Sequence, residues 1–350
     1  IFYIKITGET MKQLKIVALI AGLFAFTSAQ AGEVSVTGSM QATYQSNNDI
    51  TTGNPLGMNT DLTFKGETDT DFGTATWTMA TDGTFLGGAT ANANGNDHSL
   101  KLATSMGTFG IANSGDAANA VDDITPTAFE EANGSGSGSY TVDLGSGMDG
   151  SMSLSYGNSD VMGTGISVAY NYYPKLNGTT NNEKAASGNV AGFEDYKTSQ
   201  TMNVGIPVAG LPVIGDTLLG GLKVTLGYER TDNTLSTVQG KEGGTVAVNL
   251  PVGPLSVGYQ TKRFQAMGTD ITTDTFYTDN ILGIAYAIND DLALSYNIYE
   301  SEQHQNDGSN VEQETKAINL AYTVGGLTLG FQDAKTSNSG YASTTDNDTR

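Results

Sequence analysis

An alternation of apolar and polar residues recurs along most of the chain and limits it to an extended, sheet-forming architecture. Leu222, Leu226 and Tyr228 belong to one apolar row, and small or polar residues such as Lys223 and Thr225 stand between its members. Successive side chains of a strand point to opposite faces, so each such segment has one apolar and one polar face. Glycine is 45 of 350 residues and the hydrophobic share is only 38%, which argues against a helical core. Further rows of this kind are Leu255, Val257 and Tyr259; Leu292, Leu294, Tyr296 and Ile298; and Leu327, Leu329 and Phe331.

The connections between these segments are alternately short and long. Short turns rich in Gly or Asp are expected at 71–73, 106–108, 145–150, 252–254, 289–291 and 325–326. Long polar stretches are expected at 46–57, 82–97, 115–137, 159–197, 232–242, 265–276, 303–314 and from 337 onward. Short turns on one rim and long loops on the other are typical of a transmembrane antiparallel β-barrel, whose apolar face contacts lipid. The predicted fold class is therefore all-β, a single transmembrane barrel.

The number of strands tests this interpretation, because a single-chain barrel of this kind has an even number. Ile166, Val168, Tyr170 and Tyr172 alternate like a strand, but counting them places every later long loop on the wrong rim, so they are interpreted as a hairpin extension within the fourth long loop. About fifteen strands then remain, and the sequence predicts sixteen with the final strand missing after Arg350. The predicted outward strands begin near Val34, Thr74, Thr108, Ser151, Leu222, Leu255, Leu292 and Leu327, and the return strands lie near 58–67, 98–105, 139–144, 200–208, 244–252, 278–288 and 315–324.

The first thirty-one residues read as a targeting segment. Residues 11–31 combine a start methionine, two lysines, an apolar run and an Ala29-Gln30-Ala31 cleavage site, which is typical of a secretory signal peptide. Residues 1–10 are interpreted as an upstream extension, and residues 32–350 as the exported barrel.

Composition excludes several classes of function. The chain has no cysteine and only two histidines, His98 and His304, which leaves little material for a zinc site or a nucleophilic triad. The formal net charge of −21 repels phosphate backbones, so nucleic acid is not expected as a partner. We therefore expect a protein that is not an enzyme and has no cofactor, although the acidic outer loops could bind Ca²⁺ or Mg²⁺.

These features together resemble the general-diffusion porin family of Gram-negative outer membranes. The resemblance is carried by the signal peptide, the strand EVSVTGSMQATYQ, the hairpin LTFKGETDTDFGTATWTM, the run MGTFGIANSGDA and the L-x-L-x-aromatic strands. It implies sixteen-stranded barrels associated as a homotrimer, in contact with lipid and lipopolysaccharide, and open to small hydrophilic solutes and ions. It also implies that the third long loop, about 115–137, folds into the barrel and forms the constriction.

The charged residues of that loop and of the facing wall are the candidate site. The acidic candidates of the constriction are Asp116, Asp122, Asp123, Glu130 and Glu131, and the loop contains no basic residue. The strand alternation places Lys65, Lys101, Lys223 and Lys262 on the inner wall. Carboxylates with few cationic counterparts attract cations in a pore, so the sequence predicts a cation-preferring channel for passive diffusion. Two alternatives remain open: a solute-specific channel, and an exported β-sandwich or adhesin without a pore.

Overall fold

The computed structural model describes residues 34–46, 55–81, 96–132, 143–145, 148, 151–176, 196–210, 218–233, 239–267, 276–305, 308–343 and 345–349. The predicted signal peptide with Ala29 and Ala31 lies outside these residues, so the cleavage site stays a prediction. The strands are β1 (Val34–Tyr44), β2 (Leu56–Thr70), β3 (Gly73–Thr81), β4 (Asn96–Thr104), β5 (Gly107–Ala112), β6 (Ser153–Asn158), β7 (Ser167–Tyr173), β8 (Tyr196–Pro207), β9 (Lys223–Asn233), β10 (Lys241–Val252), β11 (Leu255–Gln265), β12 (Phe276–Ala287), β13 (Leu292–His304), β14 (Val311–Val324), β15 (Leu327–Ser337) and β16 (Asn347–Thr349). Short 3₁₀ turns lie at η1 (Asn119–Val121), η3 (Val161–Gly163), η4 (Val208–Gly210), η5 (Leu218–Gly221) and η6 (Ser339–Tyr341).

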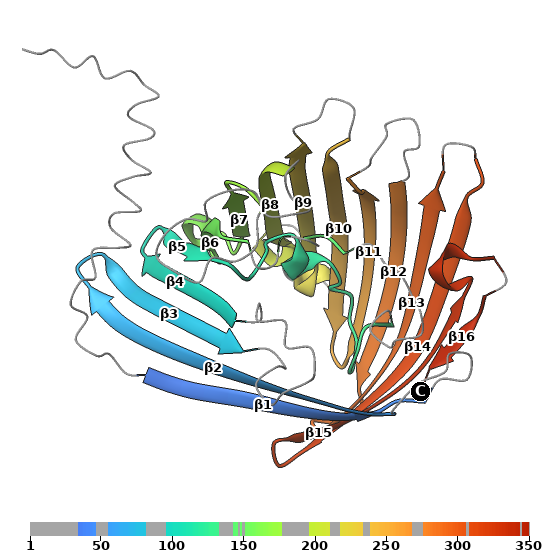
Figure 1. The fold of residues 1–350 in the computed structure, drawn as a ribbon. Helices are drawn as coiled ribbons and strands as arrows, with labels where there is room; N and C mark the ends of the chain where they lie inside the picture. The colour runs from blue at the N-terminus through green and yellow to red at the C-terminus, as the bar shows by residue number, and fades with distance from the viewer. Residues whose placement is uncertain are drawn as a thin grey trace, which may run out of the picture.

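All strands belong to one sheet in which each pairs antiparallel with its neighbour in sequence, in the order β1 to β16. The sheet curves around a central space (Figure 1). A single meandering sheet of this kind excludes the alternative of a β-sandwich, which needs two sheets packed face to face.

One segment rejected as a strand from the sequence is a strand, and one predicted strand is not a strand where the structure describes it. Residues 167–173 are a full strand, β7, paired with β6 and β8, and not a hairpin extension. The segment 143–145, which belongs partly to the predicted return strand 139–144, is not a strand, and residues 139–142 lie outside the described residues. β6 is instead the return strand after β5, and 159–166 is a short turn. Exchanging one strand for another leaves every later long loop on its predicted rim.

The C-terminal end also differs from the expectation. Residues 337–350 were predicted as a long loop, but Asn347–Thr349 form β16 and pair with Ala334–Thr336 of β15. Among the described residues, no pairing joins β16 to β1. The rest of the predicted final strand stays a prediction.

The apolar row of each strand lies on the outer surface. Leu294, Tyr296, Leu320, Tyr322 and Phe331 are all exposed large side chains of β13, β14 and β15. Direct cross-strand partners share a face, and the register pairs Leu294 with Leu320 and Leu320 with Phe331. The result is a continuous apolar outer band. The described part of the chain contains no helix with the length and apolar character needed to traverse a membrane.

Candidate functional site

Residues 113–132, the described first part of the connection between β5 and β6, run along the interior of the curved sheet (Figure 1). Asp116 shapes its first turn, because its Oδ1 accepts hydrogen bonds from the backbone N–H groups of Ala118 at 2.7 Å and Asn119 at 3.0 Å. Tyr173 of β7 donates its hydroxyl to Asp116 Oδ2 at 2.8 Å. Asp116 is buried. This predicted constriction residue therefore holds the loop in shape and does not line the open passage.

A series of amide side chains fixes the loop backbone to the wall. Asn203 of β8 donates to Ala117 O at 2.6 Å, Asn249 of β10 to Ile124 O at 2.9 Å, Asn297 of β13 to Pro126 O at 3.0 Å and Gln332 of β15 to Glu131 O at 3.1 Å. A loop inside a barrel has backbone carbonyls that are costly to leave without partners. These side chains, each on a different strand, provide those partners along much of the loop.

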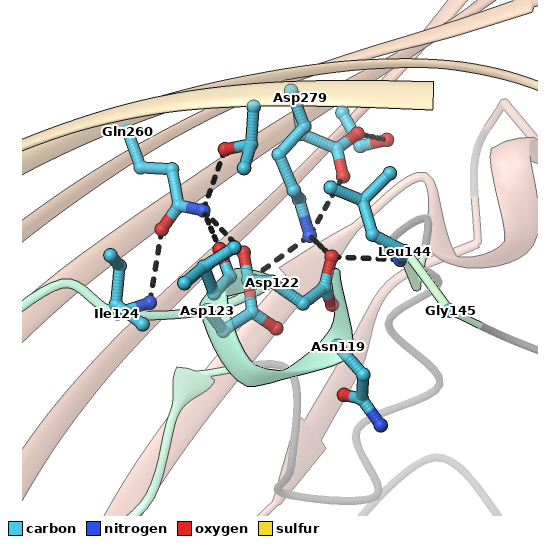
Figure 2. A network of polar contacts seen from close by, with 12 residues as sticks. Asn119, Asp122, Asp123, Ile124, Leu144, Gly145, Gln260 and Asp279 are labelled. Atoms are coloured by element: carbon cyan, nitrogen blue, oxygen red, sulfur yellow. Dashed lines mark hydrogen bonds and ion pairs between the residues drawn. The ribbon is translucent and has the colours of Figure 1, made fainter. Parts of the chain in front are cut away.

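Gln260 of β11 is the most heavily bonded of these amides. It is fully buried. Its Nε2 donates to the carbonyl oxygens of Val121, at 2.9 Å, and of Asp122, while its Oε1 accepts the N–H of Ile124 at 3.0 Å. One side chain thus satisfies three backbone groups around the turn η1, as Figure 2 shows in part. Only its inward position on a regular strand distinguishes Gln260 in the sequence.

Glycines of the wall make room for the loop where the two approach closely. A Cβ on Gly283 of β12 would lie 2.6 Å from Pro126 O and 2.8 Å from Thr125 Cβ. A Cβ on Gly330 of β15 would lie 2.2 Å from a ring carbon of Phe129. Both distances are below any real contact, so only glycine permits the loop to lie against these strands.

A buried cluster of three carboxylates around one lysine lies at the centre of the contact (Figure 2). Lys262 Nζ of β11 lies 3.3 Å from Asp122 Oδ1 and 3.0 Å from Asp123 Oδ1, both in the loop, and 3.5 Å from Asp279 Oδ2 of β12. Lys262 is 1% exposed. This lysine is therefore not an accessible pore-wall cation, as the sequence suggested, but the counter-ion that joins the loop to the wall.

The second limb of the loop is fixed by another buried ion pair. Glu229 of β9 and Lys241 of β10 form a salt bridge of 3.0 Å, and Glu229 Oε2 also accepts the N–H of Gly145 at 2.8 Å. The N–H of Leu144 donates to Asp122 Oδ1 at 2.8 Å and so joins the two limbs. The sequence had placed 145–150 at a short turn of the rim; Gly145 lies instead in the interior.

Burial changes the titration of the loop acids. It raises the pKa of Asp122 to about 7, with the attraction of Lys262 opposing this shift and the repulsion from Asp123 adding to it. Burial, together with repulsion from Asp123 and Glu130, also raises the pKa of Glu131. Three carboxylates that share one ammonium cannot all remain ionised at low cost, so the cluster holds a proton more readily than isolated acids.

This shift predicts a pH dependence of stability. Between about pH 4 and pH 7 the folded chain binds the Asp122 proton more tightly than the unfolded chain does, so this group's contribution to the free energy of unfolding falls as pH rises. The variant Asp122→Asn cannot titrate there. Its melting temperature in detergent, followed by circular dichroism, should therefore fall less than that of the wild type between pH 5 and pH 8. Equal falls in the two proteins would contradict the assignment.

Glu130 and Glu131 lie near the end of the described part of the first limb, which ends at Ala132. Gln332 donates to the backbone carbonyl oxygens of both residues, at 3.3 Å and 3.1 Å, which leaves the carboxylates outside this contact. Both residues are partly exposed, whereas Asp116 and Asp122 are buried and the carboxylate of Asp123, 12% exposed, is paired with Lys262. Of the five predicted acids, Glu130 and Glu131 are therefore the ones most open to the passage.

The register shows which residues of the opposite wall face the interior. Asn171 of β7 donates to Gly115 O at 3.1 Å, so it points inward. Asn171 pairs directly with Ser155 of β6, and Ser155 pairs with Gly110 of β5. Gly110 in turn pairs with Lys101 of β4. Direct partners share a face, so Lys101 also points inward. Its side chain is exposed.

Two further predicted lysines share this inward face. Lys101 pairs with Thr76 of β3, which pairs with Glu67 of β2, and Lys65 lies two residues before Glu67. Lys65 Nζ is 2.9 Å from Glu67 Oε2, so its charge is matched by a neighbouring carboxylate. Lys223 pairs with the inward Asn249. The structure thus gives Lys65, Lys101 and Lys223 the orientation that the alternation predicts.

The acids proposed for divalent cations are spread over different parts of the fold. Asp160 lies in the short turn 159–166 and not in a long loop, whereas Glu312 and Glu314 lie in β14. Among the residues that the structure describes, no three acidic or histidine side chains are grouped as metal ligands.

A curved antiparallel sheet with an apolar outer band, a polar interior and an inward loop defines an outer-membrane channel. The family model described as Gram-negative porin matches residues 17–345, and the chain belongs to this family. The protein therefore resides in the outer membrane. The search of curated proteins found no match.

Solved structures show the same fold at low sequence identity. OmpT, an outer membrane protein of Vibrio cholerae, matches with a TM-score of 0.62 and 12% identity over 93% of this chain and 98% of that chain. The anion-selective porin from Comamonas acidovorans matches with a TM-score of 0.58 and 12% identity over 91% and 97%. Salmonella typhi OmpF in complex with daunomycin matches with a TM-score of 0.57 and 16% identity over 91% and 96%.

Proposed function

We propose that this porin is a cation-preferring channel through which small hydrophilic solutes and ions diffuse passively, with no bond made or broken. The supporting observation is the charge balance across the passage. On the loop side, Glu130 and Glu131 are partly exposed, while Lys262, which contacts the same loop, is buried and shared by three carboxylates.

On the opposite wall, β4 contributes the inward ammonium of Lys101, but β2 contributes mainly carboxylates. The inward row of β2, read at two-residue spacing, contains Asp61, Lys65, Glu67 and Asp69, which is three carboxylates to one ammonium. The Lys65 charge is matched by Glu67 at 2.9 Å. Carboxylates on both sides of a water-filled passage raise the local concentration of cations, within a screening length of about 8 Å at physiological salt. One solved relative in fold is an anion-selective porin, so the charges of this chain and not its fold support the preference.

The exposed carboxylates should control this preference. Neutralising both in the variant Glu130→Gln/Glu131→Gln is expected to lower the cation-to-anion permeability ratio by about two- to threefold, because the nearest fixed charges are lost. The measurement is the reversal potential in a KCl gradient across a planar bilayer.

The control is Glu312→Gln, which removes one carboxylate charge from the outer surface. Gln313, its neighbour in β14, is buried on the inner side, so Glu312 points outward. This variant should keep the wild-type ratio. A wild-type reversal potential of the sign expected for anions would overturn the proposal.

A solute-specific channel has less support. Aromatic side chains stacked along the inner wall would provide a binding path for sugars. Phe129, at 36%, is the one exposed aromatic of the described inner loop. The exposed Trp77, Tyr259 and Tyr296 alternate with inward residues and so point outward.

We also propose that the protein is a homotrimer. β5, β6 and β7 have only 6, 6 and 7 residues. A transmembrane strand needs about 9–11 residues to cross the hydrocarbon core. The sector of the wall formed by these three short strands is therefore poorly suited to face lipid alone. Its outward side chains include Ile111, Leu154 and Tyr170. Neighbouring copies would cover this sector, and a solved form of the Vibrio cholerae OmpT is a trimer.

A further inference from the structure

The connection between β15 and β16 begins with the turn η6, whose backbone is unusual. Asn338 and Tyr341 both have a left-handed conformation, with φ of 53° and 57°, and Gly340 between them has φ of 66°. Residues other than glycine adopt this conformation at a cost, so surrounding contacts must hold it.

The contacts that hold this turn come from β14. Asn338 Nδ2 donates to Glu312 O at 2.9 Å. The N–H of Gly340 donates to Gln313 Oε1, also at 2.9 Å. Gln313 is buried on the inner side of β14, so the turn is fixed to the inner side of the wall. Tyr341, which ends the turn, can therefore reach the interior.

The ring of Tyr341 packs on the support of the inner loop. Its centre lies 5.4 Å from the centre of the Tyr277 ring of β12. Tyr277 in turn packs against a buried cluster that consists of Ala118, Leu144 and Phe264. Ala118 belongs to the first limb of the inner loop and Leu144 to the second. An aromatic contact thus connects the last long connection to both limbs.

The hydroxyl group of Tyr341 provides a second, polar link. It lies 2.7 Å from Ser301 Oγ of β13, and the Ser301 hydroxyl donates to Asp279 Oδ1. Because the single hydroxyl proton of Ser301 goes to Asp279, Tyr341 must be the donor to Ser301. The other carboxylate oxygen, Asp279 Oδ2, lies 3.5 Å from Lys262 Nζ. The two hydroxyl groups therefore orient the wall carboxylate of the buried lysine cluster.

We propose that Tyr341 is a positioning residue for the inner loop, which it stabilises through Ser301 and Asp279. Hydrogen bonds in series polarise one another, and each is strong in a buried environment. Without the Tyr341 hydroxyl, Asp279 is held less firmly against Lys262, and the loop aspartates share a weakened anchor. Opening of the last long connection and opening of the inner loop are therefore coupled. This coupling is independent of the proposed ion preference.

The test is hydrogen–deuterium exchange of the full chain in detergent, followed by mass spectrometry. Two loop amides report on docking, because the N–H of Ile124 is bonded to Gln260 Oε1 and that of Leu144 to Asp122 Oδ1. Tyr341→Phe removes the hydroxyl and keeps the ring. It should accelerate exchange at both amides about tenfold, since one buried hydrogen bond is lost. Ser301→Ala, which removes the middle of the relay, should have the same effect.

The matched control is Tyr228→Phe, which removes a hydroxyl that donates to Glu242 at 2.7 Å on the outer side of the wall. It should leave exchange at the loop amides as in the wild type. The strand amides of β11 should exchange equally slowly in every variant, and heat-modifiable mobility on gels verifies folding.

Three results would overturn the proposal. They are unchanged exchange in Tyr341→Phe, faster exchange confined to residues 338–343, and equal acceleration in the loop and in β11. The second result would mean that Tyr341 supports only its own turn, and the third that the whole barrel is loosened. Exchange does not depend on conduction, so failure here is distinct from failure of the proposed channel function.

Discussion

Lys262→Met is expected to release the first limb of the inner loop and raise the single-channel conductance. The substitution leaves Asp122, Asp123 and Asp279 buried together without their ammonium. Removing one partner from a buried ion pair costs about 3–5 kcal/mol. The loop can avoid this cost by leaving the wall. We therefore expect a larger and noisier open state in planar-bilayer recordings.

Lys223→Met is the matched control for this experiment. It removes the same positive charge from the same inner face, but Lys223 is exposed, and the salt bridges of the three aspartates are formed by Lys262. Its conductance in symmetric salt should change little. An unchanged open state in Lys262→Met, in a chain whose folding is verified by circular dichroism, would show that the cluster does not hold the loop.

Gly283→Val should displace the loop by steric exclusion and not by charge. The added Cβ would lie 2.6 Å from Pro126 O and 3.0 Å from Asn297 Nδ2, the two atoms that form a hydrogen bond between loop and wall. Neither a backbone carbonyl nor a buried amide can move aside at low cost. We expect a conductance increase on the order of twofold, because the passage widens where the loop withdraws.

The comparison variant is Gly157→Val, on the inner face of β6. A Cβ there would meet only Val168 O, at 3.9 Å, which is an ordinary contact. This variant should conduct like the wild type. If Gly283→Val also conducts like the wild type, the loop does not limit the passage at Pro126.

The sequence predicts the fold well because its signal is periodic and local. Alternating rows such as Leu292 to Ile298 define a strand without knowledge of any other segment, and the turns define the rims. The failures lie where that signal is weak. Residues 139–144 alternate enough to suggest a strand, but the adjacent limb is instead held inside the sheet by Glu229, 84 residues away. Likewise, the sequence misses β7 because 139–144 is counted as a strand. With that strand included, adding β7 would place every later long loop on the wrong rim.

The site is less predictable from the sequence than the fold is. Whether a charged residue lines the passage or holds the loop depends on its burial and not on its residue type. Strand alternation places Lys65, Lys101, Lys223 and Lys262 on one face, yet only the structure shows that Lys262 is enclosed by three aspartates. The same holds for Asp116, which caps a turn and so cannot attract a passing ion. Gln260 could have been suspected as an inward amide on an otherwise regular strand, but its partners lie 136 to 139 residues away.

These long separations determine the order in which the molecule can assemble. The inner loop precedes β6 in the chain, but its partners Gln260, Asn297 and Gln332 lie on β11, β13 and β15. The contact between Gln332 and Glu130 spans 202 residues. Contacts so distant in sequence form only after the intervening chain is in place. The sheet must therefore close most of its circumference around an unoccupied interior, and the passage becomes narrow only in a late step of folding.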